Sequence, residues 1–503
     1  MNSSKTKFSD SRVRASLYVM LFVITAVFSL ALIFNGRTAA RASVSPDASI
    51  AGAVTANNAE IARNSYALVV SRVAPAVVTI RSEGRVRAAQ QRPFLDDPTL
   101  REFFGGRIPQ QPQAPQRRSG LGSGIIVSGD GHILTNHHVI DGAEKIKVQL
   151  TDNRTFDAKL VGSDAASDLA VLKIEADNLP VLPLGNSDDV RVGDVALAVG
   201  NPLGLGQTVT SGIISAKGRS TGLSDGSFED FLQTDAPINQ GNSGGALVNT
   251  NGELIGINSQ ILSPSGGNIG IGFAIPSNMA KNVMEQLVKT GKVRRGVLGV
   301  TVQPVSSDIA QSLGMKDTSG VIVSSVQSGS SADHAGIKQG DVITKFNGTA
   351  VADSNSFRNR VAGAQPDASV TLTISRDGRE QELSATLGER TSSKTDEKGS
   401  ANGSGGDATG GKLGVSVEPV TPELAAQLRL AAGTKGLVVR NLDPEGAAAE
   451  AGLEQGDVIL EFNRQAVSSM EQLRAAMQGA NGRPTLMLIN RRGNNLYVTV
   501  RLR

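Results

Sequence analysis

The C-terminal part of the chain contains one sequence twice, and this repeat constrains the fold more than any other feature. Residues 298–305 read LGVTVQPV and residues 413–420 read LGVSVEPV, an offset of 115 residues. Further along, AGIKQGDVITKFN at residues 335–347 matches AGLEQGDVILEFN at residues 451–463. Self-similarity at this spacing indicates one domain of about 90 residues that occurs twice.

Each copy is predicted to alternate strands and short helices. The first helix is expected at residues 307–313 and 422–428, the next strand at 321–326 and 437–442, and a second helix near Phe357 or Leu473. The copies are placed at residues 296–390 and 412–503. Residues 391–411 between them have almost no large apolar side chain, so we expect a flexible linker there.

Residues 66–291 are predicted to form a separate domain. Short β-branched runs such as VVTIRS, GHILTN and VALAVG alternate with Gly, Asn and Asp turns over residues 66–275, which favours an antiparallel barrel or sandwich. Residues 276–291 change to a helical period, with Pro at the start and Gly at the end. Residues 84–119 are rich in Gln, Pro and Arg and are expected to form a long surface loop.

The N-terminus has the three parts of an export signal: a basic start, an apolar run at residues 17–34, and small residues that fit a cleavage site near residue 42. The run of 18 residues also reaches the lower limit of a spanning helix, so an uncleaved membrane anchor is the alternative. Both interpretations place the rest of the chain outside the cytoplasm. Residues 43–65 are expected to connect this leader to the first domain.

Composition excludes several classes of function. The chain has no Cys, so a disulfide framework, a thiolate metal site and a cysteine nucleophile are impossible. Residues 1–42 carry +5 of the formal net charge of +3, which leaves −2 for the remainder and gives no basis for nucleic-acid binding. We expect no cofactor and no metal, because the histidines are few and no phosphate-binding GxxxxGK[ST] occurs. The histidines are His132, His137, His138 and His334.

The segment GNSGG at residues 241–245 contains the candidate nucleophile. Glycines around Ser243 let backbone N–H groups approach an oxyanion, although a Gly-rich turn with an exposed Ser is also consistent with this segment alone. The same residues fit the nucleophile elbow of an α/β-hydrolase, which requires a later His. Only His334 follows, and its counterpart in the second copy is Glu450, so chain order disfavours that class and an esterase activity.

The chain does contain the opposite order, with a histidine before the serine. His138 is expected to end the strand GHILTN, Asp168 precedes the apolar strand LAVLKI, and Ser243 comes last, which is the His, Asp, Ser order of chymotrypsin-like barrels. Each of the first two residues alone could be structural. Together in this order they predict a catalytic triad.

These motifs resemble the HtrA/Deg (Do-like) family of exported serine proteases. The matching stretches are ILTNHHVI, SDLAVLKI, TDAPINQGNSGGALVN, RRGVLGVTVQPV and both GDVI repeats, which together cover nearly the whole chain after the leader. The resemblance implies a mainly β protein: a chymotrypsin-like double β-barrel serine protease domain followed by two PDZ domains, each a small β-barrel with two helices.

The resemblance also assigns roles to residues. The family histidine corresponds to His138 rather than His137, because His138 directly precedes Val139, and the family acid corresponds to Asp168 rather than Asp164. The oxyanion hole is expected at Gly241 and Asn242, with the N–H groups of Gly241 and Ser243 as donors and Asn242 between them. Ile238 resembles the family position that forms the wall of the pocket for the substrate residue before the scissile bond. The segment expected to pair with the substrate backbone is Ser259, Gln260, Ile261, Leu262 and Ser263.

In the repeats, the resemblance implies loops whose N–H groups bind a terminal carboxylate while an extended chain adds to a strand. An ordinary strand start with a structural Gly is the alternative for each loop. The residues of the first loop are Arg295, Gly296, Leu298, Gly299 and Val300, within 295–300, and those of the second are Leu413, Gly414 and Val415.

The expected function is that of an ATP-independent periplasmic endopeptidase that degrades unfolded or damaged proteins, with a chaperone-like holdase or PDZ scaffold as the alternative. The family resemblance implies a homo-oligomer based on trimers, with larger cages, and residues 94–104 offer exposed Phe that could bridge subunits. Membrane contact is expected only through residues 17–34. Redox control of residues 84–119, which some family members have through a disulfide, is excluded because Cys is absent.

Overall fold

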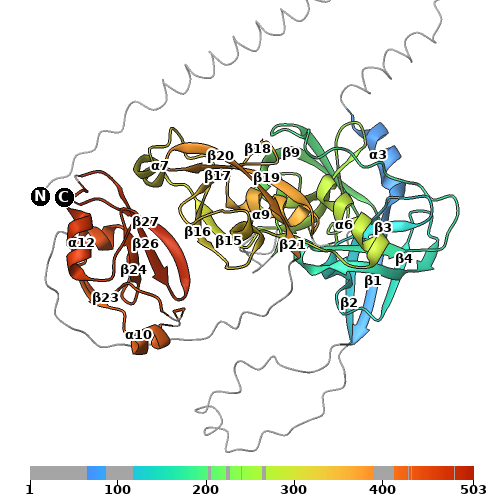
Figure 1. Cartoon of the computed structure of the whole chain (residues 1–503). Helices are drawn as coiled ribbons and strands as arrows, with labels where there is room; N and C mark the ends of the chain where they lie inside the picture. Colours follow the sequence, from blue (N-terminus) through green and yellow to red (C-terminus); the bar gives the residue numbers. More distant parts are fainter. Residues whose placement is uncertain are drawn as a thin grey trace, which may run out of the picture. The chain divides into compact units, whose positions relative to one another are not determined.

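The computed structural model describes residues 65–85, 117–201, 206–221, 227–239, 241–262, 268–389, 413–428, 430–431, 433–480 and 482–502 (Figure 1). The elements described below lie within one unit, Tyr66–Arg503. The predicted leader, the segment 94–104 and the linker 391–411 lie outside the described residues, as does most of the loop 84–119. In the described part of the chain, no helix is long and apolar enough to cross a membrane.

The first domain begins with an antiparallel sheet of seven strands in the order β5-β4-β1-β2-β3-β7-β6. Strand β4 shows why one face of this sheet is buried: Ile146 and Val148 are buried, whereas Lys145 and Lys147 alternate with them and are exposed. The strands are β1 (Val77–Arg85), β2 (Arg117–Ile126), β3 (His132–Thr135), β4 (Lys145–Gln149), β5 (Thr155–Asp157), β6 (Lys159–Asp164) and β7 (Leu169–Lys173).

The second sheet of this domain closes into a six-stranded barrel in the order β10-β13-β12-β11-β8-β9. Closure leaves no free strand edge, so every strand of this barrel has two hydrogen-bonded neighbours. The strands are β8 (Val195–Gly200), β9 (Thr208–Arg219), β10 (Phe231–Thr234), β11 (Ala246–Val248), β12 (Leu254–Ile261) and β13 (Gly272–Pro276).

Helices join the two sheets. Helix α6 (Ser277–Thr290) contacts β6 and β7 of the first sheet and β12 of the second. It follows Pro276 and ends at Gly291, which has φ +71°, so the predicted helix and both of its boundary residues are confirmed. The shorter helices of the domain are α3 (Ala67–Val73), the 3-10 turn η1 (Ala74–Ala76), α5 (His137–Ile140) and the 3-10 turn η2 (Ala165–Ser167).

The two repeats have the same strand order, β15-β16-β17-β19-β20 in the first and β22-β23-β24-β26-β27 in the second. The first contains β14 (Gly296–Val297), β15 (Val300–Pro304), α7 (Ser307–Leu313), β16 (Val321–Val326), α8 (Ser331–His334), β17 (Val342–Phe346), β18 (Thr349–Ala350), α9 (Ser354–Gly363), β19 (Ser369–Arg376), β20 (Arg379–Thr386) and β21 (Gly388–Glu389). The second contains β22 (Val415–Pro419), α10 (Pro422–Gln427), β23 (Leu437–Leu442), α11 (Ala447–Glu450), β24 (Val458–Phe462), β25 (Gln465–Ala466), α12 (Met470–Met477), β26 (Thr485–Arg491) and β27 (Asn494–Val500).

The GDVI motif of each repeat has a structural role. Asp341 is 1% exposed and accepts two hydrogen bonds of 2.7 Å from the guanidinium of Arg376. Asp457 and Arg491 repeat this pair in the second copy, at 2.8 and 2.7 Å. A buried carboxylate requires such a partner, so the motif is explained by folding rather than by chemistry.

The mainly β fold class is confirmed, and so are the predicted strands at residues 321–326 and 437–442. The first sheet of the protease-like domain is an open path of strands, whereas only the second is a closed barrel. His334 lies at an exposed position of α8 and its counterpart Glu450 is likewise exposed in α11, which agrees with a structural position outside any catalytic site.

Candidate active site

The structure brings His138 and Asp168 into direct contact. The Nδ1 atom of His138 lies 3.0 Å from Oδ1 and 2.9 Å from Oδ2 of Asp168, and the backbone N–H of His138 donates to Oδ1 at 3.0 Å. A carboxylate on Nδ1 fixes the imidazole with its Nε2 free to accept a proton. The side chains of His138 and Asp168 are 50% and 27% exposed, so the pair opens to solvent.

The position of His138 differs in one detail from the expectation. It lies in the one-turn helix α5, two residues after Asn136, rather than at the end of strand β3. Asn136 is fully buried and donates from Nδ2 to the carbonyl of Asp168 at 3.0 Å. The backbone N–H of His137 donates to the same carbonyl at 3.1 Å, so the start of α5 is held to the loop that carries Asp168.

Asp168 has an unusual backbone conformation. It ends η2 with φ +54° and ψ +41°, in the left-handed region that Asp tolerates better than most residues. Asp164 at the start of η2 accepts a hydrogen bond from the N–H of Ser167 at 2.9 Å. The turn η2 is therefore capped by Asp164 and directs the side chain of Asp168 toward His138.

Ser243 lies in a loop held from both sides by Ser123. The Oγ of Ser123 donates to the carbonyl of Gly241 at 2.6 Å, and its N–H donates to the carbonyl of Ser243 at 2.8 Å. Gly244 has φ +80°, and a Cβ there would lie 2.2 Å from the carbonyl oxygen of Ser123. Only Gly fits this position, so at least one glycine of GNSGG is required by the path of the chain.

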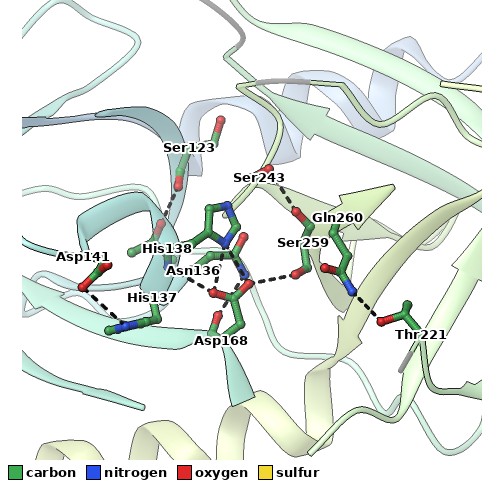
Figure 2. A network of polar contacts seen from close by, with 11 residues as sticks. Ser123, Asn136, His137, His138, Asp141, Asp168, Thr221, Ser243, Ser259 and Gln260 are labelled. Atoms are coloured by element: carbon green, nitrogen blue, oxygen red, sulfur yellow. Dashed lines mark hydrogen bonds and ion pairs between the residues drawn. The ribbon is translucent and has the colours of Figure 1, made fainter. Parts of the chain in front are cut away.

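The nucleophile and the base are not yet hydrogen-bonded. Ser243 Oγ donates to the carbonyl of Ser259 at 3.0 Å, and no bond joins it to His138 among the contacts of the described residues (Figure 2). Catalytic hydrogen bonds are often long or misaligned without substrate, so this geometry is compatible with catalysis.

The structure corrects the assignment of Asn242 to the oxyanion hole. Its N–H donates to the carbonyl of Asn239 at 3.0 Å and its side chain is 2% exposed, because the residue turns into the loop. Asn242 therefore shapes the loop and offers no N–H to the cleft. Gly241, with φ +100°, and Ser243 remain the candidates for the two donors, as the resemblance implies.

The other residues of this domain that are predicted to contact substrate lie in different environments. Ile238 is 1% exposed within the apolar core and lines neither cavity next to the triad, so its role in a substrate pocket stays a prediction. Ser259, Gln260 and Ile261 form the end of β12, and Leu262 follows with 44% exposure. Ser263 lies outside the described residues.

Two cavities adjoin the triad. One of about 410 Å³ is lined by His138, Asp168, Ser259 and Gln260, among others, and the second, of about 260 Å³, is lined by His138, Gly241 and Ser243, among others. His138 lines both cavities, whereas Ser243 lines only the smaller one. Within the described part of the chain, no group of three metal-ligating side chains is found.

The first repeat contains a groove between β15 and α9. This cavity of about 690 Å³ is lined by Gly296, Leu298, Gly299 and Val300 of the predicted loop, and by Phe357 and Val361 of α9 among others. In the second repeat Leu413, Gly414 and Val415 take equivalent positions. The carbonyl of Leu413 accepts from Ala448 as that of Leu298 accepts from Ala332.

The side chain of Arg295 pairs with Asp164, and its place in the predicted carboxylate-binding loop stays a prediction. Its guanidinium donates to both carboxylate oxygens of Asp164 at 2.8 and 2.5 Å, and it stacks over the ring of Phe228 at 4.5 Å from the centroid. It does not line the groove of the first repeat, because this ion pair draws it toward the triad domain. Burial alone would raise the pKa of Asp164, but Arg295 and Ser167 hold it below the usual value.

The hydroxyl of Ser259 is a partner of Asp168, the candidate acid, that the sequence did not indicate. Ser259 Oγ donates to Oδ2 of Asp168 at 2.9 Å, in addition to the role of its carbonyl toward Ser243 (Figure 2). Ser259 and Asp168 are 91 residues apart in the chain, and no local pattern distinguishes this Ser from others in strands.

Family models match three parts of the chain: a trypsin-like peptidase domain at residues 122–257 and PDZ domains at residues 296–387 and 438–491. Fold and site therefore define a trypsin-like serine peptidase followed by two PDZ domains. A "probable periplasmic serine endoprotease DegP-like" of Chlamydia trachomatis is 43% identical over 445 residues, which cover 86% of this chain and 87% of the relative.

The Escherichia coli "periplasmic pH-dependent serine endoprotease DegQ" is 43% identical over 87% of this chain and 91% of its own. A solved structure titled "HtrA-type protease AlgW with decapeptide" is 45% identical, with a TM-score of 0.51 over 65% of this chain and 100% of that one. The chain belongs to the HtrA/Deg family of periplasmic serine endoproteases.

Proposed function

We propose that this protein is an ATP-independent endopeptidase that degrades unfolded, misfolded or damaged proteins through an acyl-enzyme on Ser243. The observation that carries the proposal is the His138–Asp168 pair, whose histidine lines one cavity together with Ser243 and another together with Asp168. His138 takes the proton of the Ser243 hydroxyl as the oxygen attacks the scissile carbonyl, and then gives it to the leaving amine. A water molecule then attacks the acyl-enzyme, with His138 again acting first as base and then as acid, and the acyl half leaves Ser243.

Asp168 and the loop around Ser243 complete the mechanism. Asp168 holds the tautomer of His138 and stabilises the imidazolium without taking the proton. The N–H groups of Gly241 and Ser243 bind the negative oxygen of the tetrahedral intermediate. For this to occur the Ser243 hydroxyl must leave the carbonyl of Ser259 and turn to Nε2 of His138, a rotation about one side-chain bond.

The PDZ domains are proposed to capture chain ends. The groove between β15 and α9 is open, and an extended segment added beside β15 would gain backbone hydrogen bonds there. We propose further that residues 1–42 direct export to the periplasm and that the protein acts as a trimer-based homo-oligomer, the assembly that the family resemblance implies. Sequencing the mature N-terminus separates cleavage near residue 42 from anchoring, and native mass spectrometry measures the assembly.

Digestion of casein without nucleotide tests the activity. Wild type should cleave it, whereas Ser243→Ala and His138→Ala should lose activity on the scale of about 10⁶-fold seen for triad removal in subtilisin. His137→Ala is the matched control and should retain most activity, because His137 contacts Asp141 and not Asp168 through its ring. Protection of casein from aggregation without cleavage by wild type would favour a holdase. A dead His137→Ala beside an active His138→Ala would reverse the histidine assignment.

A further inference from the structure

The smaller cavity beside the triad has a lining unlike the rest of the cleft. This small-residue pocket, of about 260 Å³, is defined here by Ser82, Gly84, Gly120, Asp141 and Gly142 together with the catalytic groups. Most of its lining residues are glycine, serine or alanine, and Leu121, His138, Val139 and Asp141 complete the lining. Asp141 is the single carboxylate among the lining residues, and none of them is Lys or Arg.

The pocket lies on the leaving-group side of the scissile bond. Ser259 and Gln260, the segment expected to pair with the acyl half of a substrate, line the larger cavity and not this one. Figure 2 shows Asp141 and Ser259 on opposite sides of His138. Because His138 delivers its proton to the departing amine, the residues that follow the scissile bond must extend away from Ser259, toward the small-residue pocket.

The position of Asp141 is fixed by backbone contacts around it. Ser82 Oγ donates to the carbonyl of Val139 at 2.8 Å, and the N–H of Glu144 donates to the carbonyl of Glu83 at 2.8 Å. A Cβ on Gly84 would lie 2.2 Å from the carbonyl oxygen of Gly142, so strand β1 and the turn after α5 pack without a gap. Asp141 is therefore attached to a rigid wall of the cleft rather than to a mobile tip.

The charge of Asp141 is only weakly compensated. Its Oδ1 lies 3.8 Å from Nε2 of His137, beyond hydrogen-bonding distance, and its side chain is 58% exposed. A substrate ammonium or guanidinium entering the pocket would therefore meet a carboxylate that retains bonding capacity. An acidic side chain at the same place would meet like charge.

We infer that Asp141 makes this protease select a basic side chain at the first or second residue after the scissile bond. The inference rests on the proposed endopeptidase activity and adds the charge preference of its leaving-group side. Exposed ion pairs of this kind change rates by up to about fivefold each, so the preference is graded rather than absolute. It acts during acylation, because the leaving-group half has departed before the acyl-enzyme is hydrolysed.

The test uses three fluorescence-quenched peptides that share all residues before the cut and carry Lys, Gln or Glu in the two positions after it. Mass spectrometry confirms the cleaved bond, and a chromogenic nitroanilide with the same acyl half supplies the reference rate for each variant. For wild type we expect kcat/KM to fall from Lys to Gln to Glu, with a Lys-to-Glu ratio of about 10 or more. Asp141→Asn should bring this ratio to about 1–2, and Asp141→Lys should invert it.

Asp157→Asn is the matched control, since it removes one exposed carboxylate from β5 of the same sheet and should keep the wild-type ratio. A wild-type ratio near 1, or a ratio that Asp141→Asn leaves unchanged, overturns the inference while the activity itself stands. Absence of cleavage by wild type, or equal cleavage by Ser243→Ala, overturns the proposed function instead.

Discussion

Arg295, the residue immediately before the first PDZ domain, forms a bidentate ion pair with Asp164, four residues before the catalytic acid. The side chains are 12% and 11% exposed, and the guanidinium stacks on Phe228. Asp164 in turn caps the turn η2 through the N–H of Ser167, and η2 ends at Asp168. One continuous set of contacts therefore connects the start of the PDZ domain to the orientation of the triad.

Removing Arg295 should lower both stability and turnover. Arg295→Ala leaves the buried carboxylate of Asp164 without its partner, which costs about 3–5 kcal/mol in comparable buried pairs. Because η2 then loses its anchor, kcat on a short peptide should fall about tenfold or more. Arg294→Ala is the control: its pair with Glu389 is about half exposed and should be worth no more than about 1 kcal/mol. Urea unfolding and peptide kinetics measure both effects.

The pH dependence of this pair has a definite sign. The pKa of Asp164 is held below its usual value, so the stabilisation is complete above the unfolded pKa of about 4 and is lost as the pH falls through the lower folded pKa. The difference in stability between wild type and Arg295→Ala should therefore shrink in acid. Equal effects of Arg294→Ala and Arg295→Ala on stability and on kcat would refute the coupling between this ion pair and the triad.

Ser259→Ala should weaken catalysis without removing it. The substitution deletes the hydroxyl that donates to Oδ2 of Asp168 but keeps the backbone carbonyl that accepts from Ser243. Asp168 retains its contacts with His138, so we expect kcat to fall about tenfold with little change in KM. Ser128→Ala, which removes an exposed hydroxyl that donates to Asp130, serves as the control. A loss as large as that of Ser243→Ala would mean that Ser259 does more than orient the acid.

Asp230 should make stability depend on pH between about pH 4 and pH 6. It lies just before β10, where burial and then the charges of Asp353 and Asp188 raise its pKa to about 6. Because folding raises the pKa of this carboxyl, the free energy of unfolding should fall by about 1.4 kcal/mol per pH unit between about pH 4 and pH 6. Asp230→Asn should thus be more stable than wild type by up to about 3 kcal/mol near pH 7.5.

This advantage of Asp230→Asn should disappear as the pH falls toward about 4, where wild-type Asp230 is protonated in both states. Calorimetric melting at several pH values follows the effect. Asp157→Asn should show no such trend. An advantage that stayed constant with pH would indicate that packing, not charge, distinguishes the two side chains.

The sequence predicted those parts of this protein that local patterns encode. Helix α6, strands at 321–326 and 437–442, and the repeated sheet order follow from periodicity and from the duplicated GDVI motif. The pair of His138 and Asp168 was predicted by chain order within a family resemblance. The partners of Asp168 and Asp164 were not, because Ser259 and Arg295 reach them across 91 and 131 residues. Such contacts depend on how sheets and domains pack, which short motifs do not record.

Arg295 and Asn242 show the limit of transferring roles by motif. The family resemblance places Arg295 in a loop whose N–H groups bind a carboxylate, and it does not indicate that the Arg295 guanidinium pairs with Asp164 in the neighbouring domain. Asn242 lies between two oxyanion donors, yet its own N–H closes a turn with Asn239. In both cases the group is already hydrogen-bonded to a partner, and only the three-dimensional structure shows which partner that is.

The last prediction concerns how substrate capture serves the active site. A chain held in the groove of the first PDZ domain has a raised effective concentration near Ser243, so long unfolded proteins should gain more from the groove than short peptides do. Deleting residues 296–503 would test this poorly, because α9 also contacts the triad domain: Asn355 and Asn359 donate to the carbonyl of Glu229 at 2.7 and 2.6 Å.

A full-length variant avoids that problem. Val300 is half-buried, lines the groove, and starts strand β15. Val300→Glu puts a negative charge where a terminal carboxylate and an apolar side chain are proposed to bind, and should lower kcat/KM on unfolded casein about tenfold or more while changing a short chromogenic peptide less than about twofold. Val288→Glu is the matched control, since Val288 is 46% exposed on α6, outside the groove. Equal small losses on both substrates would leave the PDZ domains with a role in assembly instead.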